Sequence, residues 1–283
     1  MNKTRDSVKI YFCLPDSDQF NSLEDFIDNL VEKSKENTSA DEDSKWGGFL
    51  GKSYLVDALE TKFNNEDYEK YVVPETGILG GIKTSVEDAV MRAKKILSNK
   101  QYPLRIFIYP WFPKETEAVF RGTMGTAFWA NTFHLYIDTN NFSTESLKDT
   151  VVHEYNHAMY FNHHSPFEQT ILNAIIMEGL AENFRDEING KNPSPWATVI
   201  KEKEVESHLE KIENDLDSHA EYGDLYKKIF YGIGEHRRWL GYSLGYRIVN
   251  SFMSLHPDVK WGDLIKLEST KFLQEPVHEN IET

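Results

Sequence analysis

The pentapeptide His153-Glu154-Tyr155-Asn156-His157 combines residue types and a spacing that suit metal chemistry. In a helix, residues four positions apart share a face, so His153 and His157 can bind one zinc ion through nitrogens at about 2.0–2.1 Å. Glu154 projects roughly 100° further round the helix. There it can hold a metal-bound water as general base without competing for the metal. The spacing therefore predicts part of a catalytic zinc site.

A pattern this short also arises by chance, and the alternative is two solvated histidines on a surface helix. The surrounding residues favour a buried helix over 144–161. Ser143 and Thr144 are candidate N-caps, and Pro166 requires the helix to end before it. Apolar residues recur with helical spacing at Leu147, Val151, Ala158 and Phe161. Glu154 projects into this stripe, where a glutamate needs a specific role.

A third ligand is predicted in the segment 171–182, which is nearly apolar all round and indicates a buried helix. A lone carboxylate buried there is costly, and a metal ion would remove that cost at Glu178. Two histidines and one glutamate leave a fourth zinc position open for water, which is the catalytic arrangement. The alternative is an ordinary salt bridge from Glu178 to Arg185 or a lysine.

Glu182 lies one turn beyond Glu178 and is a candidate partner for the ligating histidines. A carboxylate there can accept the free N–H of a histidine ligand and fix the orientation of its ring. Asp149, one turn before His153, is a weaker candidate for the same role.

Three motifs together resemble gluzincin metallopeptidases: residues 153–158, Glu178-Gly179-Leu180-Ala181-Glu182, and Leu240-Gly241-Tyr242-Ser243-Leu244-Gly245-Tyr246. More narrowly, residues 100–270 resemble a bacterial family of predicted zinc-dependent proteases described as a domain of unknown function. The resemblance implies one zinc ion and a peptide or unfolded-protein substrate. It also implies roles for five residues: ligands His153, His157 and Glu178, general base Glu154, and second-shell acid Glu182.

Gluzincins often stabilise the developing oxyanion with a tyrosine or histidine downstream of the glutamate ligand. The resemblance therefore makes Tyr242, Tyr246 and His236 candidates. The two tyrosines are four residues apart on an expected helix, where Gly241 and Gly245 would let another helix approach closely. The alternatives are that the tyrosines only pack between helices, and that His236 is a solvated or capping residue.

Such enzymes usually bind the substrate backbone along an edge strand. The candidates here are residues 125–130 and 132–137, with turns expected at 122–126 and at Ala130-Asn131. A plain hairpin against the core is the alternative. His163 and His164 follow the motif helix and are expected to be non-ligands that suit its negative C-terminal end.

The remaining pattern predicts an α+β, zincin-like fold with a cleft between its two parts. A mixed N-terminal region (1–100) precedes a catalytic region (101–283) that is mainly helical, or the two form one continuous domain. Strands are expected at 8–12 and 104–109 and turns at 72–82. A polar connector is expected at 37–45 and a glycine-broken loop at 46–51. Further helices are expected at 22–35, 85–97, 167–185, 196–216, 219–230, 236–255 and 261–268.

Composition narrows the class of protein. A formal net charge of −15 argues against a nucleic-acid or anionic-membrane surface. Cys13 is the one cysteine, so no intrachain disulfide forms and no thiolate pair can hold the metal. The N-terminus lacks an apolar signal segment and no stretch is long enough to span a membrane, so we expect a cytoplasmic protein. The oligomeric state stays open.

A second class of function also fits these patterns. A non-catalytic zincin-like protein could act as a regulatory or binding module, with a structural or vestigial metal site. Structural zinc sites usually close with four protein ligands, so an open fourth position would speak against this alternative.

Overall fold

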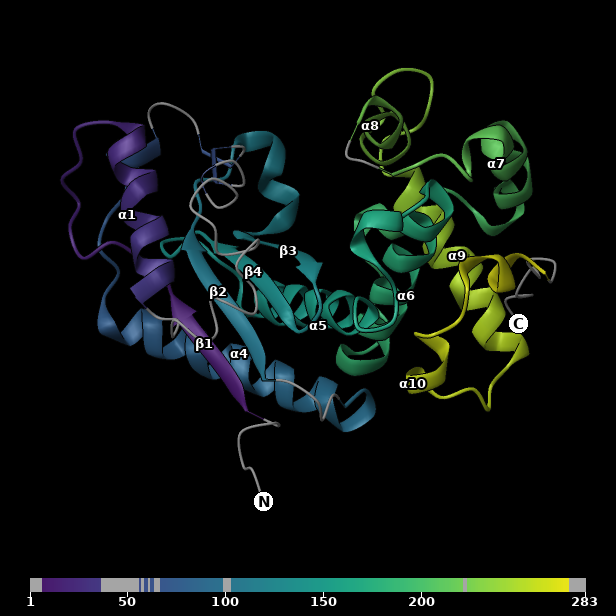
Figure 1. The fold of residues 1–283 in the computed structure, drawn as a ribbon, viewed down its shortest axis with the longest axis horizontal. Helices are drawn as coiled ribbons and strands as arrows, with labels where there is room; N and C mark the ends of the chain where they lie inside the picture. Colours follow the sequence, from purple (N-terminus) through teal and green to yellow (C-terminus); the bar gives the residue numbers. More distant parts are fainter. Residues whose placement is uncertain are drawn as a thin grey trace. The chain divides into compact units, whose positions relative to one another are not determined.

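A four-stranded sheet forms the first half of the fold in the computed structural model (Figure 1). The structure describes residues 7–36, 56, 59–60, 62–63, 67–98, 103–220 and 223–274. The strands are β1 (Val8–Phe12), β2 (Leu104–Pro110), β3 (Thr123–Trp129) and β4 (Thr132–Ile137), in the order β1-β2-β4-β3. β1 and β2 pair in parallel, as do β2 and β4, so that Ile106 lies opposite both Ile10 and Phe133.

The two central strands form the core of this sheet. β2 and β4 are buried along their whole length, as expected for strands covered on both faces. Asn131 has a φ of +59° in the two-residue connection between β3 and β4, which confirms the turn predicted at Ala130-Asn131. The turn predicted at 122–126 is wrong beyond Gly122. Thr123 starts β3 there, and its hydroxyl bonds the Ser146 hydroxyl at 2.8 Å.

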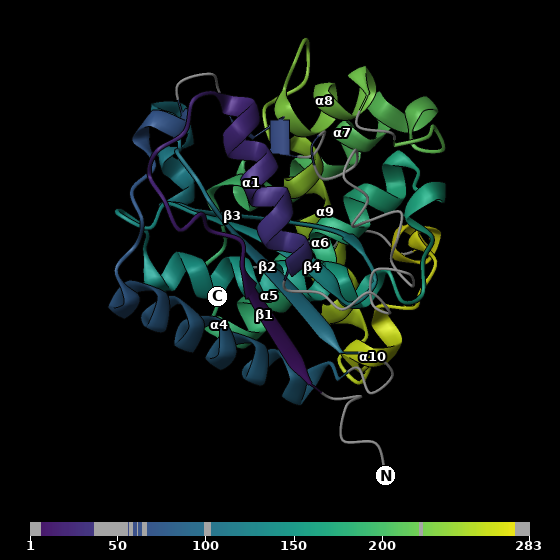
Figure 2. The ribbon, with the colours of Figure 1, turned by 60° about the vertical axis from the view of Figure 1, so that its left-hand side comes forward.

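Helix α1 (Leu23–Glu36) lies against the sheet (Figure 2). The Ser22 hydroxyl accepts from the backbone N–H of Asp25 at 3.1 Å, which caps the helix start as its sequence predicts. Its apolar face is buried at Phe26 and Leu30. The Ser34 hydroxyl bonds the Tyr109 hydroxyl of β2 at 2.9 Å, so polar groups as well as apolar ones join α1 to the sheet.

Helix α4 (Thr76–Ile96) is longer than the sequence predicts. The turns expected at 72–82 are wrong from Thr76 onward, although this segment contains three glycines. The apolar stripe continues back to Ile82, which is fully buried like Val86 and Ala89. The glycines lie on the open side, where an added Cβ would meet nothing within 4 Å. Burial of the apolar face therefore outweighs the low helix propensity of glycine.

The second half of the chain is mainly helical, which confirms the α+β class. Its helices are α5 (Thr144–Tyr160), α6 (Ile171–Asn189), α7 (Val205–Ile212), α8 (Asp224–Tyr231), α9 (Leu240–Leu255) and α10 (Trp261–Leu264). The helix predicted at 196–216 is broken into 3-10 turns before α7. The reason is that the Ile200 N–H bonds the Ser243 hydroxyl at 3.1 Å instead of a helical carbonyl.

Three other helices start later than the sequence predicts. α6 begins at Ile171 rather than 167, because the Thr170 hydroxyl accepts from the Asn173 N–H at 3.2 Å. α9 begins at Leu240 rather than 236, because Trp239 has a φ of +66°. Before α8, the Ala220 N–H bonds the Gln169 carbonyl, so the helix predicted from 219 starts only at Asp224. α10 ends at Leu264 rather than 268.

The chain divides into two compact units that alternate along the sequence. The first comprises residues 1–90, 100–126 and 132–151, and the second comprises 91–99, 127–131 and 152–283. The boundary near residue 100 and the cleft between two parts remain proposals. The connector at 37–45 and the loop at 46–51 lie outside the described residues. No helix in the described ranges has the length and apolar character needed to cross a membrane.

Candidate metal centre

The motif helix α5 is capped and buried as its sequence predicts. The Ser143 hydroxyl accepts from the backbone N–H of Ser146 at 3.3 Å, which makes Ser143 the cap. Leu147, Val151 and Ala158 are fully buried, so the stripe faces the interior. His157 is buried and only 13% of the His153 side chain is exposed, which excludes two freely solvated histidines.

Three ligand atoms converge where α5 meets α6. Nε2 of His153 and Nε2 of His157 lie 2.9 Å apart. Oε2 of Glu178 lies 3.2 Å from the first nitrogen and 3.3 Å from the second. Ligands at zinc's usual bond lengths stand about 3.3–3.4 Å apart in a tetrahedron, so the two spacings from Glu178 match those around a zinc ion, and the spacing between the histidines is shorter. Within the described residues, these three side chains form the one such group of potential ligands.

Glu178 is held in this position by the tight packing of α6. A Cβ added to Gly179 would lie 2.1 Å from the carbonyl oxygen of Gly245, and one added to Gly245 would lie 1.9 Å from that of Ile175. The backbones of α6 and α9 therefore touch directly beside the carboxylate. The predicted close helix approach at Gly245 is confirmed, and Gly241 likewise packs against the ring of Phe230.

The charges in the group support one another. Burial would raise the pKa of Glu178, but the charge of His157 and hydrogen bonds from both histidines lower it to about 2. Burial disfavours the charged form of His153, yet its hydrogen bonds to Glu178 and Glu182 raise its pKa well above the ordinary value. A divalent cation would supply the positive charge that these buried carboxylates require.

Glu182 lies beside Nδ1 of His153. Its Oε1 is 3.1 Å from Nδ1 of His153, and the carboxylate is fully buried. Burial would raise the pKa of Glu182, but the bond to His153 and the nearby Arg185 lower it. Nδ1 of His153 faces Glu182 and Nε2 faces the ligand group, which is the ring orientation that a metal ligand needs. Arg185 lies beside Glu182 and Asp186.

The other residues near the motif have different surroundings. Glu154 is 5% exposed and follows His153 directly on α5. Asp149 is half-buried two turns before His157. His164 stacks on Tyr160 with ring centroids 4.0 Å apart, and its Nε2 donates to the Ile265 carbonyl at 2.9 Å. Burial and the charge of Lys266 lower the pKa of His163.

The three candidate oxyanion donors from the sequence, Tyr242, Tyr246 and His236, have different surroundings. The Tyr246 hydroxyl donates to Asp186 at 2.8 Å, two turns of α6 beyond Glu178. His236 lies close enough to His208 that its charge contributes to lowering the pKa of that residue, after burial and nearer charges. Tyr242 packs on Phe230, with centroids 5.4 Å apart, and its hydroxyl bonds that of Tyr231.

Two residues near the candidate ligands were not singled out from the sequence. Burial raises the pKa of Tyr231, and the negative charge of Glu178 raises it further, which places this phenol within electrostatic reach of the ligand. Trp196 donates its indole N–H to Oε1 of Glu182 at 2.7 Å. Neither residue belongs to a recognisable motif. Each is brought near the site by the fold and not by its spacing from the motif residues.

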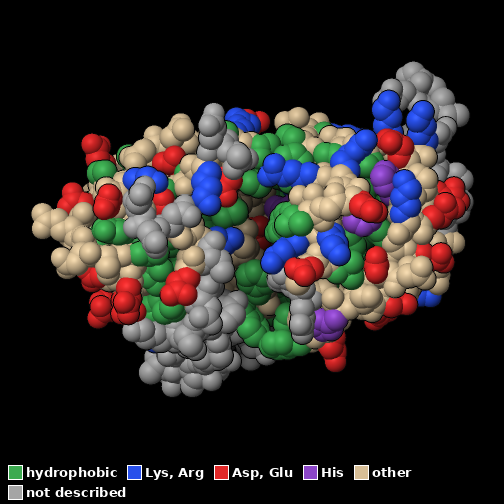
Figure 3. Space-filling model, turned by 90° about the horizontal axis from the view of Figure 1, so that it is seen from above, with side chains coloured by type: hydrophobic (Ala, Val, Ile, Leu, Met, Phe, Trp, Pro, Cys, Tyr) green, Lys and Arg blue, Asp and Glu red, His purple; other side chains and the backbone are tan. Residues whose placement is uncertain are grey.

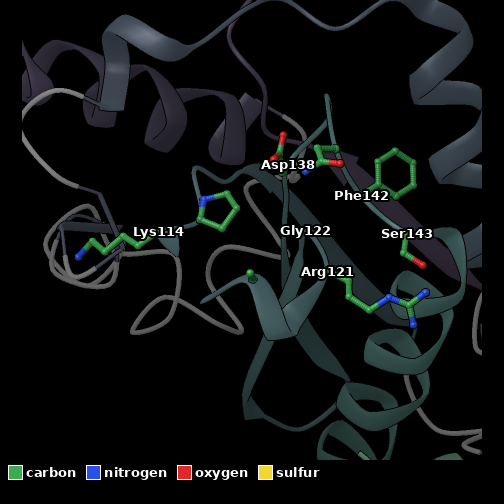
Figure 4. A pocket seen from close by; sticks show the side chains of 9 residues that line it. Lys114, Arg121, Gly122, Asp138, Phe142 and Ser143 are labelled. Carbon is green, nitrogen blue, oxygen red and sulfur yellow. The ribbon is translucent and has the colours of Figure 1, made fainter. Parts of the chain in front are cut away.

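A separate hollow lies in the first unit (Figure 4). Its lining includes Lys114, Arg121, Asp138 and Ser143 but no histidine or cysteine. Arg121 is paired with Glu145 at 3.1 Å. This hollow therefore lacks the nitrogen ligands that zinc prefers.

A family comparison agrees with this geometry. Residues 82–274, more than half of the chain, match the model of a family described as predicted Zn-dependent protease (DUF2268). The chain belongs to this family. The matched range contains the whole ligand group, together with Glu154, Glu182 and Trp196. The family's description is itself a prediction, so it supports zinc and protease chemistry without fixing the roles of residues.

Individual relatives share part of the chain. Uncharacterized protein YjfC of Bacillus subtilis (strain 168) is 26% identical over 136 residues, which are 44% of this chain and 45% of that protein. Uncharacterized protein YjaZ of the same organism is 29% identical over 112 residues, 38% of this chain and 43% of that protein. The chain thus aligns with less than half the length of each. No solved structure matches.

Proposed function

We propose that this protein is a zinc-dependent metallopeptidase that binds one zinc ion through His153, His157 and Glu178. The observation that carries the proposal is the triangle of ligand atoms, with edges of 2.9, 3.2 and 3.3 Å. Two neutral imidazoles and a carboxylate are the ligands of a catalytic zinc site with an open fourth position. The family's description supports the same chemistry.

The proposed mechanism assigns the proton transfers to Glu154. A zinc ion held by His153, His157 and Glu178 would lower the pKa of a bound water and polarise the scissile carbonyl. The Glu154 carboxylate would accept the proton that the attacking water gives up, as the water oxygen bonds to the carbonyl carbon and the π electrons of the carbonyl move onto its oxygen. Glu154 then delivers that proton to the amine nitrogen as the C–N bond breaks. Its burial, at 5% exposure, suits a base that must work away from bulk solvent.

A phenol near Glu178 is the proposed oxyanion donor. The sequence offers Tyr242, Tyr246 and His236 as candidates, and we favour Tyr242 acting with Tyr231. The hydrogen bond between these two hydroxyls and the electrostatic influence of Glu178 on Tyr231 support this choice. Tyr246 donates to Asp186 and is the weaker candidate.

The proposed substrate is a peptide or an unfolded protein segment. β3 stands at the edge of the sheet, whereas β4 is paired on both sides, so β3 is the strand we propose for pairing with a substrate backbone. Acidic and basic side chains both occur on the face drawn in Figure 3.

The test is the variant Glu154→Gln, assayed on fluorescence-quenched peptides and unfolded casein. Glutamine keeps the size of the side chain but cannot accept the proton, so turnover should fall at least about 100-fold. Zinc content should stay unchanged, because Glu154 is not a ligand. Glu145→Gln is the matched control, since Glu145 is an exposed residue of the same helix. Undiminished hydrolysis by Glu154→Gln at unchanged zinc content would falsify the assigned role.

A further inference from the structure

Trp196 is linked to His153 through one residue, Glu182. Its indole N–H donates to Oε1 of Glu182 at 2.7 Å, and the same oxygen lies 3.1 Å from Nδ1 of His153. Both donors therefore meet on one buried carboxylate oxygen. An oxygen with two donors has little freedom to rotate, so the indole fixes the direction from which Glu182 accepts the histidine N–H.

The loop that carries Trp196 is anchored on both neighbouring helices. Arg185 of α6 donates to the Ser194 hydroxyl at 2.6 Å and to the Asn192 carbonyl at 2.9 Å. On the other side, the Ser243 hydroxyl of α9 donates to the Ala197 carbonyl at 3.0 Å. Hydrogen bonds to residues on both sides of Trp196 in the sequence thus hold its loop in place. A residue fixed in this way can position a partner instead of following it.

We propose that Trp196 is a positioning residue for the zinc ligand His153, acting through Glu182. This inference rests on the proposed function in that it takes His153, His157 and Glu178 as zinc ligands. The indole holds the Glu182 carboxylate, the carboxylate holds the Nδ1–H of His153, and Nε2 of His153 is thereby aimed at the metal position. Partners of this kind change metal affinity about 10–100-fold when they are lost.

The same helix provides a matched control. Trp261 donates its indole N–H to Oε2 of Glu187 at 2.6 Å; Trp261 is buried and Glu187 exposed, whereas Trp196 is half-buried and Glu182 buried. Glu187 belongs to α6, as Glu182 does, but it lies more than a turn further along the helix. Trp196→Phe and Trp261→Phe therefore each remove an indole hydrogen bond to a glutamate of α6. Of these two bonds, the one from Trp196 leads to His153.

The experiment measures the zinc dissociation constant of each variant by competition with a chelator, and the melting temperature of the metal-free proteins. Trp196→Phe should weaken zinc binding at least about tenfold, and Trp261→Phe should change it less than about twofold. In a Glu182→Ala background, Trp196→Phe should have no further effect on zinc binding, because its route to His153 is gone. Equal effects of the two tryptophan variants, or full additivity with Glu182→Ala, would overturn the inference.

A second readout covers the case in which Glu182→Ala fails to fold. Zinc added to ¹⁵N-labelled protein should shift the indole N–H signal of Trp196 more than that of Trp261, with Trp196→Phe providing the assignment. An unmoved Trp196 signal would overturn the inference. If the wild type binds zinc and Trp196→Phe binds it with unchanged affinity, this inference fails and the proposed function stands. If the wild type binds no zinc, both fail.

Discussion

Gly179 and Gly245 bring the backbones of α6 and α9 into direct contact, next to Glu178, a proposed zinc ligand. A Cβ on Gly245 would lie 1.9 Å from the Ile175 carbonyl oxygen and 2.9 Å from the Gly179 nitrogen. These are backbone atoms, which cannot move aside as a flexible side chain can. The position of Glu178 therefore depends on two residues that carry no side chain.

Gly245→Ala should push α9 away from α6 and lower the free energy of unfolding by about 1–3 kcal/mol. Zinc affinity should fall with it, because Glu178 moves with α6. Gly80→Ala in α4 is the control: its added methyl meets nothing, so it should raise stability by about 0.4–1 kcal/mol. Chemical denaturation of both variants checks this. Equal behaviour of the two would contradict the packing argument.

Tyr231→Phe and Tyr242→Phe should each lower kcat about 10- to 1000-fold with little change in KM or zinc content, if their hydroxyls meet the oxyanion. Tyr246→Phe should leave kcat nearly unchanged and lower stability, because Asp186 loses a hydrogen bond. Steady-state kinetics of the three variants separate these roles. A large loss of kcat in Tyr246→Phe alone would assign the oxyanion to that residue instead.

The three residues of the proposed metal site could be singled out from the sequence because the information for them is local. His153 and His157 are fixed by helical spacing, and Glu178 by a carboxylate within an apolar run. Trp196 and Tyr231 were not predictable, because each reaches the site through a fold contact that no spacing encodes. The break in the helix predicted at 196–216 has the same origin, since the Ser243 hydroxyl takes the Ile200 N–H from a distant helix.

His134 should make the fold sensitive to acid. It is buried in β4 against Phe107, with centroids 5.5 Å apart. Burial, and then the charge of Lys62, lower its pKa from 6.5 to about 3. The folded protein keeps it neutral, whereas the unfolded chain binds a proton below pH 6.5. Its contribution to stability is therefore lost as pH falls from 6.5 toward 3, by at most about 1.4 kcal/mol per pH unit.

Replacing this residue tests the pH argument. His134→Phe should flatten the decline of unfolding free energy between pH 6.5 and about 4, measured by urea denaturation at each pH. A slope that His134→Phe leaves unaltered would show that other groups dominate the acid response.

The central claim is that His153, His157 and Glu178 bind zinc, and the most direct measurement is zinc bound per chain after excess metal is removed. The wild type should retain about one zinc ion. Glu178→Gln should retain almost none, and Glu187→Gln, on the same helix but bonded to Trp261, should retain about as much as the wild type. A wild type without zinc, or Glu178→Gln with undiminished zinc, would contradict the account.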